Sequence, residues 1–169
     1  RAYHHLAAPL SGQVDYRAAD LLKKSRTPVL VSLRWPERSR EADPEDIEAL
    51  RVLEMRERAP STPAALVKAG VPFAFYTDGL ASPRDLVRAI RRAIEAGLAP
   101  ADAVRAFTLS AAEIYGVADR LGSIDPGKIA NLVVTSGDLF QEKTQIKHVF
   151  VDGVKFEPVP EPPAEEVSR

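Results

Sequence analysis

One acidic side chain stands where an apolar segment gives way to a polar turn. Residues 73–80 read Phe-Ala-Phe-Tyr-Thr-Asp-Gly-Leu, so Asp78 directly follows a predicted buried strand. A carboxylate at the carboxyl end of a parallel strand lies where α/β proteins assemble their sites, and there it could bind a metal or accept a proton. Asp-Gly is also a common turn pair, so Asp78 could instead only shape the turn with Gly79. Asp78 is the candidate catalytic residue and the candidate metal ligand.

The three histidines do not supply the further ligands of a metal site. Hydrolytic zinc typically takes about three protein ligands, drawn from His, Asp and Glu, and leaves one position for water. His4 and His5 are adjacent, which points their rings to opposite faces of a strand, and we expect an exposed terminal segment. His148 shares a predicted strand face with Ile146 and Phe150, so we expect a packed or half-exposed strand residue. The chain has no cysteine, which excludes thiolate sites, disulfides and cysteine nucleophiles.

Strands and helices alternate through the first two-thirds of the chain. Apolar runs predict buried strands at 29–33 and 71–76. Trp35, just after the first strand, could line a pocket at the strand end or cover the core, and we favour the second. Start and stop signals predict helices at 16–25, from Asp43-Pro44 to 58, at 62–70, from Ser82 to Gly97, at 101–107 and at 110–115. This alternation predicts parallel strands with helical crossovers.

The last third changes to strands. Strands are predicted at 129–135, 146–151 and 154–156, and Asp152-Gly153 between the last two is a strong hairpin signal. The order predicts a small antiparallel or mixed sheet. Residues 157–163 are rich in proline, so we expect an extended, mobile tail.

Two segments carry a family resemblance. The Thr77-Asp78-Gly79 corner is followed, at 121–135, by Leu-Gly-Ser-Ile-Asp-Pro-Gly-Lys-Ile-Ala-Asn-Leu-Val-Val-Thr, and it is preceded, at 59–73, by a helix and a Gly-Val turn. From about residue 16 to 156, the chain resembles the C-terminal portion of metal-dependent amidohydrolases, in the imidazolonepropionase-like branch. The resemblance implies an α/β fold: the last strands and helices of a partial TIM-type (β/α) barrel, followed by strands of a small β-sandwich. It implies barrel residues at 1–116, sandwich strands at 117–157 and a flexible Pro-rich tail at 158–169.

The resemblance also implies a chemistry. Asp78 would be the retained metal ligand and general base, taking a proton from water held by the metal and passing it to the leaving nitrogen. The parent enzyme would hydrolyse a C–N bond of a non-peptide or peptide-like small-molecule amide with a divalent metal, for which zinc is expected. The family's other ligands are a His-x-His pair from the first strand and histidines from middle strands, which this chain lacks. We therefore expect the isolated chain to be inactive and to bind no metal.

Departures from the family pattern keep a second hypothesis open. Where related sequences carry a metal-binding histidine before the first helix, this chain reads Gly12-Gln-Val-Asp-Tyr16, in which Asp15 is expected to cap the helix. The family's Asp in the strand after the Pro-Gly turn is replaced by Asn131, at a position that tends to be structural. The alternative to a fragment of an active enzyme is a non-catalytic, amidohydrolase-like scaffold or binding module that has lost the metal site.

Length and composition limit the partners. The chain has 169 residues, whereas a complete barrel needs about 250. It is 45% hydrophobic and 28% charged with a net charge of −1, which is typical of a folded protein and gives no reason to expect nucleic acid. No stretch approaches the roughly 18 apolar residues of a membrane span, so we expect a soluble protein, either cytoplasmic or exported with its signal peptide removed. The open edges of a partial barrel predict association with the remainder of the parent polypeptide or a homo-oligomer.

Overall fold

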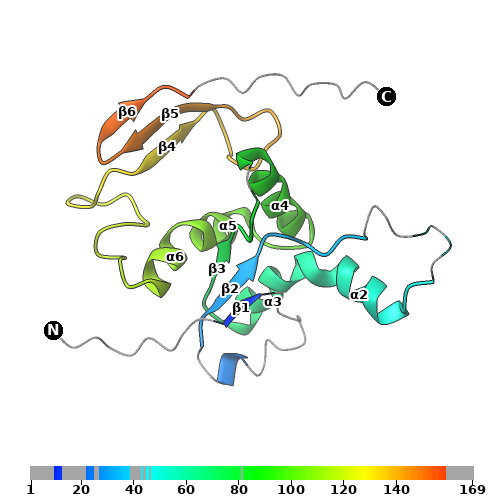
Figure 1. Ribbon diagram of the computed structural model, residues 1–169. Coiled ribbons are helices and arrows are strands. Elements are labelled where there is room, and N and C mark those ends of the chain that lie inside the picture. The colour runs from blue at the N-terminus through cyan, green and yellow to red at the C-terminus, as the bar shows by residue number, and fades with distance from the viewer. Residues whose placement is uncertain are drawn as a thin grey trace, which may run out of the picture. The chain divides into compact units, whose positions relative to one another are not determined.

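The computed structural model describes residues 10–12, 22–24, 27–38, 43, 45, 47–80 and 82–158. The chain divides after Ser123 into two compact units. The first holds a parallel sheet with helices, and the second holds an antiparallel sheet (Figure 1). Most of the helix predicted at 16–25 lies outside the described residues; residues 22–24 are helical. None of the described helices is both long and apolar enough to span a membrane.

Three parallel strands, in the order β1-β2-β3, form the sheet of the first unit. They are β1 (Leu10–Gly12), β2 (Val29–Ser32) and β3 (Phe73–Tyr76). The central strand β2 pairs with both neighbours, and all four of its residues are buried, as expected for a parallel strand covered on both faces. The predicted strands at 29–33 and 71–76 are confirmed, each slightly shorter than expected. The pattern does not predict β1, because its three residues include one apolar side chain.

Helices cover this sheet and begin and end at local signals. Helix α3 (Thr62–Ala69) ends at Gly70, whose left-handed backbone, with φ 70°, lets its N–H reach the last-turn carbonyls. Helix α4 (Pro83–Glu95) begins at Ser82, whose hydroxyl accepts the N–H of Arg84 at 3.2 Å. Helices α5 (Pro100–Phe107) and α6 (Leu109–Ile114) both contact β3. These four predicted helices are confirmed. The N-cap position of α6 is Thr108, whose side chain makes no capping hydrogen bond, and Ser110 lies inside the helix.

Helix α2 (Leu50–Arg58) corrects one prediction, because it does not begin at Asp43-Pro44. The Asp43 carboxylate accepts the backbone N–H of Glu45 at 2.9 Å, and residues 47–49 are not helical. Asp favours such local turns, which compete with helix formation. Helix α2 then runs into the short 3₁₀ helix η2 (Ala59–Ser61).

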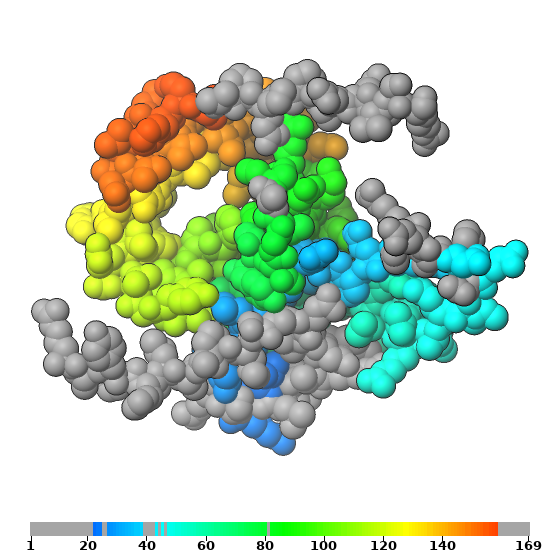
Figure 2. Space-filling view, viewed as in Figure 1, coloured from blue at the N-terminus to red at the C-terminus, as the bar shows by residue number. Residues whose placement is uncertain are grey.

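Ile47, Leu50 and Leu53 recur at a helical spacing and form an apolar stripe, but all three are exposed. Leu50 is 70% exposed and Ile47 is 98% exposed, and none of the α2 residues is buried. Figure 2 shows the cyan surface of α2 projecting from its unit. A bidentate ion pair joins Arg56 to Glu48, with one N–O distance of 2.8 Å, and ties the preceding segment to the helix. The hydrogen bond from Arg56 lowers the pKa of Glu48, so the pair is lost as the pH falls through that lowered pKa.

The second unit is a three-stranded antiparallel sheet of β4 (Leu132–Thr135), β5 (Ile146–Val151) and β6 (Val154–Phe156). The predicted hairpin is confirmed: Asp152 and Gly153 turn with φ values of 51° and 80°. Asn131 has the expected structural role, since its Oδ1 accepts the Asp152 N–H at 2.8 Å. His148 is half-buried, with its Nδ1 3.5 Å from Glu157. A sandwich needs a second sheet, which the described part of this unit does not contain, so the β-sandwich stays a prediction.

Candidate active site

Asp78 occupies a tight turn directly after β3. The N–H of Leu80 donates to the Thr77 carbonyl at 3.1 Å, and the two central residues have positive φ, 50° at Asp78 and 81° at Gly79. Positive φ at both central positions is the requirement of a type I′ turn, and Asp tolerates this conformation better than most residues. Asp78 therefore does shape the turn. Its side chain is exposed, so the turn role leaves the carboxylate available for chemistry.

Ser32 holds that carboxylate from the neighbouring strand. Ser32 ends β2, in register with Tyr76 at the end of β3, and its hydroxyl donates to Oδ2 of Asp78 at 2.7 Å. The same hydroxyl accepts the N–H of Arg34 at 3.0 Å. Ser32 is 1% exposed. Ser32 and Asp78 thus lie close together because each is at the carboxyl end of one of two adjacent parallel strands.

Ser32 stands in no sequence motif that marks it for this site. The two residues are 46 positions apart, and no local motif links them. One sequence signal could have indicated the pair: Ser32 is the lone polar residue in the apolar run 29–33. That run forms the strand next to the one that Asp78 follows.

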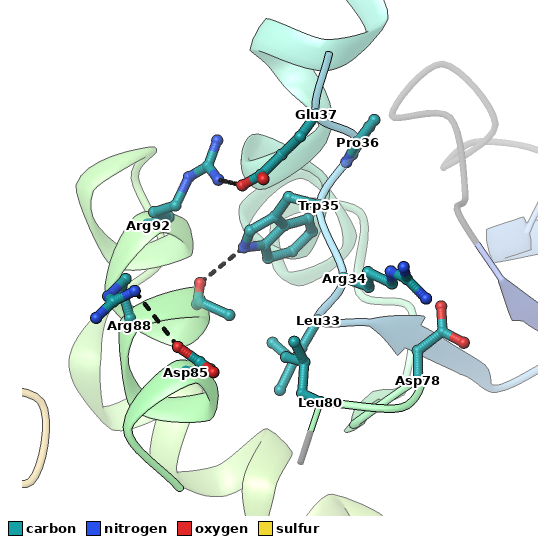
Figure 3. Close-up of a pocket in the computed structure, with 11 residues that line it drawn as sticks. Leu33, Arg34, Trp35, Pro36, Glu37, Asp78, Leu80, Asp85, Arg88 and Arg92 are labelled. Carbon is teal, nitrogen blue, oxygen red and sulfur yellow. Dashed lines mark hydrogen bonds and ion pairs between the residues drawn. The ribbon is translucent and has the colours of Figure 1, made fainter. Parts of the chain in front are cut away.

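A pocket of about 510 Å³ lies between the segment after β2 and helix α4 (Figure 3). This volume falls in the range of small-molecule sites. In Figure 3, Asp78 and Arg34 lie on one side of Leu33, and Arg88 and Arg92 lie on the other. The two α4 arginines form ion pairs within the pocket wall, Arg88 with Asp85 at 3.3 Å and Arg92 with Glu37 at 3.2 Å.

Trp35 has both of the roles considered for it. It is 7% exposed, so it covers the core, and it also lines the pocket. Its indole Nε1 donates to the Ala89 carbonyl of α4 at 2.8 Å. This bond fixes the segment after β2 against the helix.

We expect Trp35→Phe to lower the free energy of unfolding by about 1 kcal/mol, because it removes the hydrogen bond and keeps a large ring. Trp35→Ala should cost about 3–5 kcal/mol through the lost packing. Urea denaturation followed by far-UV circular dichroism measures both, since Trp35 is the chain's one tryptophan and its fluorescence is lost in the variants. Equal costs for the two variants would show that the ring contributes no packing.

Asp78 is the one candidate metal ligand that the described residues place at a strand end in this region. The described residues contain no group of three or more His, Cys, Asp or Glu side chains placed to hold a metal ion. His4, His5 and Asp15 lie outside the described residues. Asp78 fits a role as one ligand of a shared set: it is exposed, and no described residue donates a hydrogen bond to its Oδ1.

Comparison with known proteins identifies the family. Residues 39–156 match the model of the amidohydrolase family. The chain belongs to the amidohydrolase family. This confirms the resemblance carried by the Asp78 corner and the segment at 121–135.

Curated relatives of this amidohydrolase chain are much longer than it is. An adenine deaminase of Gluconobacter oxydans is 36% identical over 155 residues, which are 88% of this chain and 24% of the relative. An imidazolonepropionase of Flavobacterium johnsoniae is 35% identical over 108 residues, 55% of this chain and 26% of the relative. An adenine deaminase of Moorella thermoacetica is 41% identical over 78 residues, 46% of this chain and 13% of the relative. The chain therefore spans about a quarter or less of these relatives.

Solved structures support the same assignment. An amidohydrolase from Thermotoga maritima MSB8 superposes with a TM-score of 0.65 at 29% identity, over 85% of this chain and 35% of that one. A Xaa-Pro dipeptidase superposes with a TM-score of 0.66 at 21% identity over 88% of this chain and 40% of that one, a likeness of fold. The mixed α/β fold of this amidohydrolase chain is thus that of its superfamily.

Proposed function

We propose that this chain is the C-terminal part of a metal-dependent amidohydrolase that hydrolyses a C–N bond of a small-molecule amide or related nitrogen compound. The observation that carries the proposal is the Asp78 carboxylate, exposed at the carboxyl ends of parallel strands and held by Ser32. The family match supports it, as do relatives named adenine deaminase and imidazolonepropionase. The bond cleaved is of the non-peptide or peptide-like amide class.

The fold proposal follows from the same comparison. Strands β1, β2 and β3 would be the last strands of a TIM-type (β/α) barrel, and β4, β5 and β6 would belong to a β-sandwich. The proposed division is barrel residues at 1–116, sandwich strands at 117–157 and a tail at 158–169. In the described sheet β1 and β3 are edge strands, so their outer hydrogen-bonding groups would pair with the remaining strands of the parent polypeptide.

Asp78 has two roles in the proposed reaction. Its carboxylate would be one of the groups that hold a divalent metal, with zinc expected, and the remaining ligands would come from the rest of the parent. When bound, such a metal polarises the scissile group and lowers the pKa of water. Asp78 accepts a proton from the attacking water and delivers it to the leaving nitrogen, which leaves as a neutral amine or ammonia.

Metal removal from the full-length parent tests the function. We expect chelation to lower the hydrolysis of a panel containing adenine, cyclic amides and dipeptides by about a hundredfold or more, because the metal contributes several kcal/mol to the transition state. Added zinc should restore the activity, and the isolated 169-residue chain should have none. Activity that survives chelation, or metal-supported hydrolysis by the isolated chain, would contradict the proposal.

A non-catalytic scaffold is the second candidate. The missing histidine in Gly12-Gln-Val-Asp-Tyr16, where related sequences carry a metal-binding one, favours it. In that case the full-length parent would neither bind zinc nor hydrolyse any member of the panel. A His-x-His pair in a first strand of the parent sequence would count against the scaffold.

A further inference from the structure

We propose that Ser32 is the positioning residue of this site: its hydroxyl holds Oδ2 of Asp78 and leaves Oδ1 as the oxygen presented to the metal. This inference rests on the proposed function and adds a residue to it. Ser32 would touch neither substrate nor metal, and would act through Asp78. The hydrogen bond of 2.7 Å between Ser32 Oγ and Asp78 Oδ2 is the contact that carries it.

The backbone holds Ser32 in place. It is the last residue of β2, the central strand, which pairs with β1 on one side and β3 on the other, and it is 1% exposed. The next residue, Leu33, donates its N–H to the Tyr76 carbonyl at 3.1 Å. The backbone of Ser32 is therefore held in place at the end of the strand.

The direction of the hydroxyl proton is also fixed. Arg34 donates its backbone N–H to Ser32 Oγ at 3.0 Å, so one lone pair of that oxygen is occupied. A serine hydroxyl has one proton to donate, and the acceptor within reach is Oδ2 of Asp78. One oxygen of an otherwise exposed carboxylate is thereby held, and the rotation of the carboxylate is restricted.

A purely structural role makes a different prediction. If Asp78 served only to satisfy the buried Ser32 hydroxyl, loss of that hydroxyl would change stability and leave metal binding unchanged. If Ser32 positions Asp78, loss of the hydroxyl weakens metal binding, because groups that orient metal ligands typically contribute 10–100-fold to affinity or activity.

The test measures zinc affinity of the full-length parent by competition with a chromogenic chelator. We expect Ser32→Ala to weaken zinc binding about 10–100-fold and Ser32→Thr to keep wild-type affinity. The decisive comparison is between Ser32→Val and Ser32→Thr, since the two side chains match in shape and only threonine has the hydroxyl. This comparison tests the positioning role even if the Ser32→Ala protein does not fold. Ser61→Ala is the matched control, because the Ser61 hydroxyl donates over the same 2.7 Å to the Arg58 carbonyl.

The outcomes separate this inference from the proposed function. Equal zinc affinity of the Ser32→Thr and Ser32→Val proteins would overturn the positioning role, and the function would stand if Asp78→Asn still weakened binding. If Asp78→Asn also left zinc affinity unchanged, the proposed function itself would fail. Weaker binding in Ser32→Val and Asp78→Asn, with Ser61→Ala unchanged, supports both.

Discussion

Under the proposed function, Asp78→Asn in the full-length parent is expected to lower kcat/KM for C–N hydrolysis by about a thousandfold or more, since general acid–base catalysis alone contributes 10²–10⁴-fold. Asparagine keeps the size and one carbonyl oxygen of the side chain, so the Ser32 hydroxyl retains an acceptor. It also tolerates the positive φ of 50° at this turn. What it removes is the negative charge and the capacity to accept a proton.

Asp152→Asn is the matched control for that substitution. Asp152 is likewise an aspartate with positive φ, 51°, in the β5–β6 turn of the other unit. Asp152→Asn makes the same chemical change at a position that is not part of the strand-end site, so kcat/KM should stay at the wild-type level. Asp78→Asn and Asp152→Asn should both melt near the wild-type temperature. A folded Asp78→Asn enzyme with nearly full activity would show that Asp78 is only a turn residue.

Gly122→Ala is expected to lower the free energy of unfolding of the first unit by about 3 kcal/mol or more, from backbone strain and overpacking together. A Cβ atom at Gly122 would lie 2.6 Å from the Cβ of Ala112 and 3.0 Å from the Cα of Leu109. Both neighbours belong to α6, and the second contact is with backbone, which cannot rotate away. The φ of 92° at Gly122 adds left-handed strain for any residue with a Cβ.

Gly70→Ala separates the two causes. Gly70 has a φ of 70° in the same unit, and a Cβ there would meet nothing within 4 Å, so this variant carries the backbone strain alone, about 1–2 kcal/mol. Ala112→Gly in the Gly122→Ala background should restore part of the loss by removing the closest contact. Urea denaturation of the four proteins gives each value. Equal costs at Gly70 and Gly122 would contradict close packing of the 122 segment on α6.

Local signals account for the elements that the sequence predicted well. Ser82 caps α4, Gly70 ends α3 and Asp152-Gly153 turns the last hairpin, and each acts within a few residues of itself. Such signals depend little on the rest of the fold, so they can be interpreted from a single sequence.

The features that were missed depend on contacts between distant segments. The partner of Asp78 is Ser32, on another strand, and the need for glycine at position 122 comes from the packing of a loop on α6. The stripe of α2 has a helical period, but its burial requires a surface to pack on, and in the described residues it stays exposed. The family resemblance predicts Asp78 as the site residue from the Thr77-Asp78-Gly79 corner alone, because that motif is contiguous in the sequence.

The central place of β2 in its sheet determines how the site fluctuates. Amide exchange with solvent requires local opening, and a buried strand bonded on both sides opens last. Ser32 belongs to that strand, whereas Asp78 lies in an exposed turn closed by the single bond from Leu80 to Thr77. We therefore expect brief openings of the turn to displace Asp78 while Ser32 keeps its place in β2, so that the carboxylate returns to the same hydroxyl.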